Sequence, residues 1–62
     1  MTGAEIRIRE AIAGELVRQG EAPGMSAPWI SRDTPATILV DGAIDLDAVV
    51  AAVVHALVTP SP

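Results

Sequence analysis

The chain has 62 residues, a formal net charge of −4 and no cysteine. Its length predicts one small domain, residues 1–62, and the lack of cysteine excludes disulfides and thiolate metal sites. The acidic balance argues against direct binding to nucleic acid or to an anionic membrane surface, because Lys and Arg supply most of the affinity in both cases.

A capping box and a helical period predict a first helix over about residues 3–19. Thr2 suits the N-cap, Glu5 follows it three residues on, and Gly20 suits the position after the helix. Apolar residues repeat along two lines of this helix, so its apolar stripe is wide enough to face more than one contact surface. One line holds Ile8, Ile12 and Leu16, and the other holds Ile6, Ala13 and Val17. The alternative is a strand over residues 5–9, because Ile and Arg alternate there, but the capping box and the longer helical period favour a helix.

Residues 20–35 are predicted to form a long Pro-rich loop. Three prolines and one glycine between positions 21 and 35 exclude a regular helix there. A loop of this length is uncommon in a compact domain unless it has a function. Trp29 and Ile30 are its only strongly apolar pair, so we expect them to hold the loop against the core or against a partner.

The second half of the chain predicts a strand over about residues 37–40 and a helix over about 46–58, followed by a tail, 59–62. The strand is a β-branched run that ends at an Asp41-Gly42 turn. Asp45 suits the N-cap of the helix. An alternative is a hairpin across Asp41-Gly42, in which residues 38–40 pair with 43–46. The fold class is therefore α+β.

The second helix is apolar on nearly every side. A stripe at helical spacing is expected to face the core; it comprises Leu46, Val49, Val50, Val53, Val54 and Leu57. The opposite side carries Ala48, Ala51, Ala52, His55 and Ala56. One small chain offers too little surface to cover both sides. We therefore expect oligomerisation, most simply a dimer, through the Ala-rich side or a strand edge; the alternative is that the Ala-rich side faces solvent.

No catalytic, cofactor-binding or metal-binding residues are predicted, so the chain is not expected to be an enzyme. His55 is the single histidine of the sequence and is interpreted as a partner of the helix C-terminus. Asp41, Asp45 and Asp47 lack the order of a calcium loop and are interpreted as turn, N-cap and first-turn residues. The apolar run 46–58 is shorter than the roughly 20 residues of a membrane span, and no targeting segment is recognised, so a cytoplasmic location is expected.

Residues 36–50 run from a strand through Asp41-Gly42 and the Ile44-Asp45-Leu46 triplet into an Ala/Val helix. This segment resembles the tails of short actinobacterial and actinobacteriophage proteins, which implies a phage-type accessory protein that acts in the host cytoplasm. Most such proteins lack a known function, so the resemblance transfers no site.

The predicted function is therefore binding to a protein partner, to a second copy, or to both. The alternatives are a structural component of a virion or other assembly, and an acidic mimic of nucleic acid. The residues predicted to form the protein interface are Ile6, Val17, Trp29, Ile30, Ala48, Ala51, Ala52 and His55.

Overall fold

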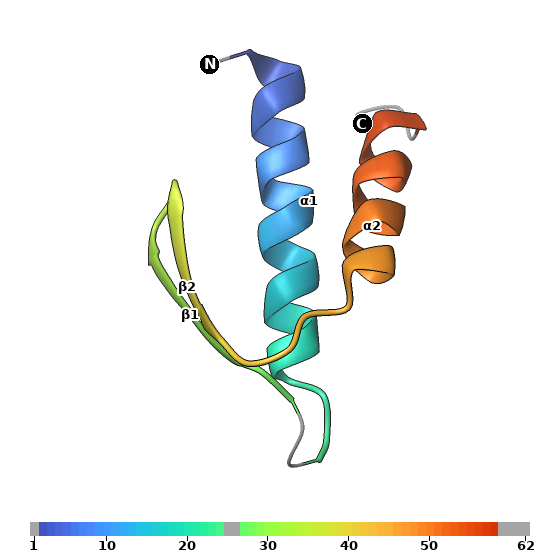
Figure 1. Cartoon of the computed structure of the whole chain (residues 1–62). Coiled ribbons are helices and arrows are strands. Elements are labelled where there is room, and N and C mark those ends of the chain that lie inside the picture. The colour runs from blue at the N-terminus through green and yellow to red at the C-terminus, as the bar shows by residue number, and fades with distance from the viewer. Residues whose placement is uncertain (1, 25–26, 59–62) are drawn as a thin grey trace.

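The structure is a computed structural model that describes residues 2–24 and 27–58. Its elements follow in the order α1 (Gly3–Gly20), β1 (Trp29–Thr34), β2 (Thr37–Asp41) and α2 (Leu46–Val58). The domain is α+β, with two helices and one two-stranded antiparallel sheet. Figure 1 shows α1 between the hairpin and α2, with the two helices running in opposite directions. The central helix α1 therefore contacts both of the other layers.

The N-terminus of α1 has the predicted cap. The Thr2 hydroxyl accepts a hydrogen bond of 3.2 Å from the Glu5 backbone N–H. The other end differs from the prediction, because Gly20 belongs to the helix and Glu21 follows as the C-cap residue with φ −91°. Gly20 is thus not the residue that stops α1, and it has a different role in packing, described below.

The expected loop over residues 20–35 is wrong for its second half, because residues 29–34 form β1. This strand pairs with β2 in the register Trp29↔Asp41, Ile30↔Val40, Ser31↔Leu39 and Arg32↔Ile38. The register shifts between Arg32 and Thr34, so Asp33 is the extra residue of a β-bulge. The alternative pairing of 38–40 with 43–46 is also wrong, since β2 pairs with the strand that precedes it.

The second half of the chain otherwise folds as predicted. The strand β2 extends one residue beyond the predicted 37–40, and α2 has the predicted bounds. The Asp45 carboxylate accepts a hydrogen bond of 3.1 Å from the Ala48 backbone N–H, which is the geometry of an N-cap. The predicted tail, 59–62, lies outside the described residues.

The core of the domain is small. In the described part of the chain, the buried residues are Ala13, Leu16, Gln19 and Pro28, and no large side chain is completely buried. Large apolar side chains of α2 and of the hairpin are instead exposed. Chains of about 60 residues are marginally stable even with an ordinary core, so these exposed surfaces are the first places to look for function.

Candidate protein-interaction surfaces

The two faces of the hairpin have different roles. Cross-strand partners project from the same face of a sheet, so Ile30, Arg32 and Ile38 share the face that contacts α1. We call the opposite side the hairpin outer face; it consists of Trp29, Ser31, Leu39 and Asp41.

Trp29 is the only aromatic residue of the chain and is 59% exposed on this outer face. Leu39 is 47% exposed and lies diagonally across the strand pair from Trp29, within reach of its large ring. Asp41 is directly opposite Trp29 and is also exposed. The hairpin outer face therefore combines an apolar pair with a carboxylate.

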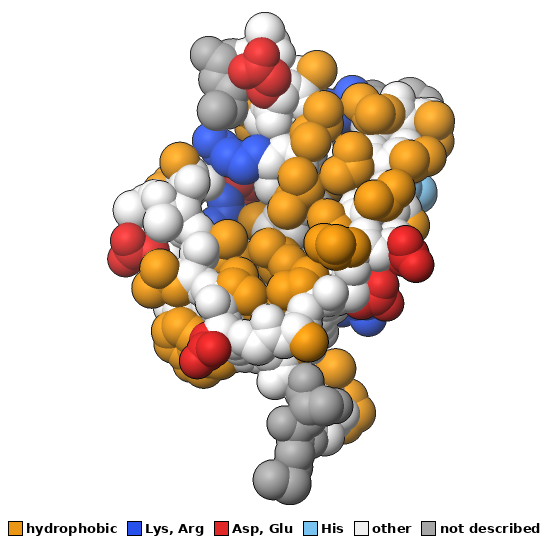
Figure 2. All heavy atoms as spheres, in the orientation of Figure 1, with side chains coloured by type: hydrophobic (Ala, Val, Ile, Leu, Met, Phe, Trp, Pro, Cys, Tyr) orange, Lys and Arg blue, Asp and Glu red, His pale blue; other side chains and the backbone are white. Residues whose placement is uncertain are grey.

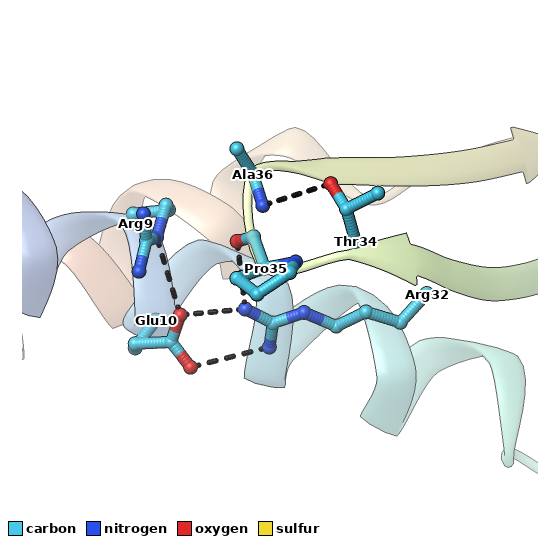
Figure 3. Close-up of polar contacts among 6 residues, drawn as sticks. All are labelled: Arg9, Glu10, Arg32, Thr34, Pro35 and Ala36. Atoms are coloured by element: carbon cyan, nitrogen blue, oxygen red, sulfur yellow. Dashed lines mark hydrogen bonds and ion pairs between the residues drawn. The ribbon is translucent and has the colours of Figure 1, made fainter.

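An ion pair holds the hairpin on α1 (Figure 3). The Arg32 guanidinium donates two hydrogen bonds to the Glu10 carboxylate, at 3.2 and 2.6 Å, and a third, at 3.0 Å, to the Pro35 carbonyl oxygen. Arg9 contacts the same carboxylate at 3.3 Å. The hydrogen bond from Arg32 lowers the pKa of Glu10, and the same bond raises the pKa of Arg32. The bidentate geometry fixes both the position and the rotation of the strand.

Two close approaches fix the other end of the hairpin. A Cβ atom on Gly20 would lie 2.6 Å from Cγ1 of Ile30 and 3.0 Å from its Cβ, so only glycine allows β1 to approach α1 this closely. Gly42 has φ +125°, and a Cβ there would lie 3.0 Å from Cα of Pro28. Because both ends of the hairpin are held, Trp29 is presented from a fixed backbone.

The structure confirms only part of the predicted orientation of α2, because Val49 and Val53 of the predicted core stripe face α1 but the other members of that stripe are exposed. The half-buried residues of α2, which form the side turned to α1, are Ala48, Val49, Ala52, Val53 and Ala56. The Ala-rich side is therefore largely covered within the chain. Ala52 and Ala56 line an open groove between the helices together with Ala11 and Gly14 of α1.

The exposed apolar side of α2 is the Val/Leu stripe. We call it the α2 outer face; it comprises Leu46 (72% exposed), Val50 (60%), Val54 (51%), Leu57 (58%) and Val58 (71%). Figure 2 shows hydrophobic side chains over α2 and α1 that continue into the hollow beside the hairpin, with charged side chains around them. Between α1 and the hairpin, Ile12, Ala13 and Ile38 line a pocket together with Arg9 and Arg32.

The α2 outer face carries a substantial driving force for association. Its exposed portions together equal about three complete apolar side chains, and burial of each stabilises by roughly 1.5–3 kcal/mol. Full burial would thus contribute at most roughly 5–9 kcal/mol per copy. Association costs an estimated 4–15 kcal/mol, so two such faces in contact can offset that cost.

A buried glutamine places the start of α2 against the end of α1. The Gln19 side chain donates to the Asp45 carbonyl oxygen at 3.1 Å and accepts from the Asp45 backbone N–H at 2.8 Å. It also donates to the Glu15 carboxylate at 2.8 Å, and hydrogen bonds from Arg18 and Gln19 lower the pKa of Glu15. Sequence analysis missed Gln19, because a lone glutamine near a helix end has no distinctive pattern.

His55 and Asp45 lie at opposite ends of α2. The described residues contain no group of three or more His, Cys, Asp or Glu side chains able to hold a metal ion. His55 lies exposed in the last turn of α2, where a cation complements the helix dipole. Asp45 is the N-cap, as its hydrogen bond to Ala48 shows.

The predicted interface residues divide between covered and exposed positions. Trp29, Ile6, Ala51 and His55 are exposed, with Ile6 at 41%. The other predicted interface residues are half-buried, namely Val17, Ile30, Ala48 and Ala52. The structure brings Ala48 and Ala52 together on the covered side of α2, and it turns Ile30 away from Trp29 toward Gly20. The residues that sequence analysis placed in the core, Leu46, Val50, Val54 and Leu57, form the larger exposed surface.

No family model matches the chain, and no curated protein or solved structure shows significant similarity to it. Among the described residues, no helix is both long and apolar enough to cross a bilayer. Functional inference therefore depends on the two exposed surfaces.

Proposed function

We propose that the chain is a non-enzymatic protein-interaction module that binds another protein through the hairpin outer face. The observation that supports this most is the exposure of Trp29, at 59%, on a hairpin that is held at both ends. Tryptophan is enriched among residues that dominate binding energy at interfaces. A fixed backbone also reduces the conformational entropy lost on binding.

The charge of the surface indicates the chemistry of the partner. Asp41 lies directly across the strand pair from Trp29, and the chain as a whole has a net charge of −4. The partner segment is expected to pair an apolar side chain, for contact with Trp29 and Leu39, with a basic side chain near Asp41. Electrostatic attraction of this kind accelerates association and weakens as salt is added.

The biological setting of this proposal is a phage-type accessory protein that modulates a host protein in the host cytoplasm. Its support is the resemblance of residues 36–50 to short actinobacterial and actinobacteriophage proteins. A structural role in a virion or other assembly is the main alternative and requires ordered high-order oligomers. Mimicry of nucleic acid ranks third, because Glu5, Glu10 and Glu15 are dispersed along the helix instead of forming a row with the aspartates.

The test is retention of proteins from an actinobacterial lysate by the immobilised chain, with Trp29→Ala as the variant. Leu57→Ala is the matched control, because it truncates a similarly exposed apolar residue on the other surface. Trp29→Ala should weaken retention of a specific protein at least tenfold, since truncation of an interface hot spot costs about 2 kcal/mol or more. Leu57→Ala should retain the protein, and added salt should release it.

Two results would contradict the proposal. Equal retention by the wild-type chain and Trp29→Ala would show that the hairpin outer face is not the binding surface. Retention of no protein beyond that held by a charge-matched reference would remove the evidence for a binding function. Circular dichroism of both variants checks that each is folded.

A further inference from the structure

The α2 outer face presents an apolar surface that intrachain packing does not use. Its five side chains are 51–72% exposed, whereas the opposite side of α2 already packs on α1. Figure 2 shows hydrophobic side chains that continue from this surface toward the hairpin. Between α1 and the hairpin, Ile12, Ala13 and Ile38 line a pocket whose rim also carries Arg9 and Arg32. The apolar surface is therefore broader than one helix stripe, and it is separate from the hairpin outer face.

The low charge of the α2 outer face allows contact with a second copy despite the net negative charge of each chain. Each chain has a net charge of −4, so two copies can associate only through a region that is nearly free of charge. Beyond Asp47, α2 carries no Asp, Glu, Lys or Arg, and His55 lies outside the Val/Leu stripe. Asp47 is the one acidic residue of α2 and lies at the N-terminal end of this face, so the rest of the face offers a charged partner no complementary group.

We propose that the α2 outer face is the contact between two copies of this chain, related by a twofold axis that places the two α2 helices antiparallel. A twofold contact requires a surface that is complementary to itself, and an uncharged aliphatic stripe meets that requirement. With the axis midway between Val50 and Val54, each Val50 lies against the Val54 of the other copy. The two Asp47 residues are then about 15 Å apart along the helices, beyond the screening distance of about 8 Å at physiological salt.

The size of the contact sets its strength. A helix of 13 residues is about 20 Å long, so two such helices bury an area at the low end of specific interfaces even when the hollow contributes. The dimer is therefore expected to dissociate at roughly micromolar concentration. Because the two copies repel each other as a whole, added salt should strengthen self-association, which is opposite to its effect on the proposed basic partner of the hairpin.

Sedimentation equilibrium of the full chain between about 5 µM and 1 mM tests the proposal. The average mass should rise from 6.4 kDa toward twice that value, and more steeply at 0.5 M than at 0.02 M NaCl. Val54→Glu should raise the dimer dissociation constant at least tenfold. Leu39→Glu, which makes the same change at a similarly exposed site on the hairpin outer face, should leave the constant within about twofold.

A second measurement tests the antiparallel register without depending on a charged substitution. The chain has no cysteine, so chains carrying Val50→Cys and chains carrying Val54→Cys can be mixed and oxidised. Random pairing of equal amounts would give twice as much mixed disulfide as each homodisulfide, and the proposed register predicts a larger excess than this. A ratio of two or less would overturn the proposed register.

Three results would overturn the dimer itself. These are a monomer at 1 mM, equal self-association by Val54→Glu and wild type, and loss of self-association in Leu39→Glu alone. A monomer whose retention of a lysate protein is lost in Leu57→Ala would assign the face to a different protein. None of these outcomes depends on Trp29, so failure of the dimer and failure of the hairpin proposal are distinguishable.

Discussion

Replacement of Gly20 by alanine tests the closest contact between α1 and β1. The added Cβ would lie 2.6 Å from Cγ1 of Ile30, 3.0 Å from its Cβ and 3.3 Å from the Pro28 carbonyl oxygen. Two of these atoms belong to the backbone or to the root of a side chain, so the strand itself must move. Overpacking of this kind costs about 1–3 kcal/mol, and the better helix propensity of alanine returns at most about 1 kcal/mol. We expect a net loss of about 1–2 kcal/mol.

Gly14 provides the matched control on the same helix. A Cβ there would have no atom within 4 Å, so Gly14→Ala should stabilise the domain by about 0.5–1 kcal/mol through helix propensity alone. In a domain of this size, 1 kcal/mol corresponds to a shift of about 4–8 °C in Tm. The two substitutions should therefore move Tm in opposite directions.

The assay is urea and thermal unfolding followed by far-UV circular dichroism. All variants are compared at one protein concentration, because a dimer would make stability concentration-dependent. A double-mutant cycle with Ile30→Ala should show favourable coupling of about 1 kcal/mol, since removal of Cγ1 relieves the nearest clash. A Gly20→Ala variant as stable as Gly14→Ala would refute the close approach of β1 to α1.

Two further predictions concern the groups that hold the elements together. Because the folded-state pKa of Glu10 is depressed, its ion pair stabilises the domain above the ordinary glutamate pKa of about 4.3, and that stability is lost as pH falls through the folded value. Between pH 7 and pH 3, the free energy of unfolding should thus fall by less in Glu10→Gln than in wild type. The same fall in both proteins would contradict this. Asp45→Ala should lower the free energy of unfolding by about 1 kcal/mol, because it removes the α2 cap. Asp45→Asn should retain most of the stability, because asparagine also caps helices. Equal losses of stability in urea titrations of the two variants would argue against capping.

Local signals in the sequence determined both helices and one strand. The Thr2 and Asp45 caps act within three residues of their own positions, so their effect needs no tertiary context. The β-branched run of β2 lies between Pro35 and Gly42, which punctuate it on either side. Elements of this kind are visible in a sequence because the interactions that select them are local.

Only the tertiary structure decided where β1 lies. Its sequence, Trp29–Thr34, has prolines nearby and several polar residues, so its intrinsic strand preference is weak. The strand depends on pairing with β2, on the Arg32 ion pair to Glu10 and on the space that Gly20 leaves for Ile30. The β1–β2 pairs are 3 to 12 residues apart, Gly20 and Ile30 are 10 apart, and Arg32 and Glu10 are 22 apart. The last two contacts join β1 to α1, and no local pattern reports them.

Tertiary structure also decided which side of α2 is exposed, and therefore the larger candidate surface. A helix that is apolar all round has no periodic signal that selects one face for the core. The side that packs on α1 combines Val49 and Val53 of the predicted core stripe with three alanines of the opposite side, Ala48, Ala52 and Ala56. Small residues allow two helix backbones to approach closely, and Gln19 fixes the start of α2 where this approach occurs. The sequence thus determined that α2 has more apolar surface than one chain can bury, and packing determined that Val50 and Val54 carry the excess.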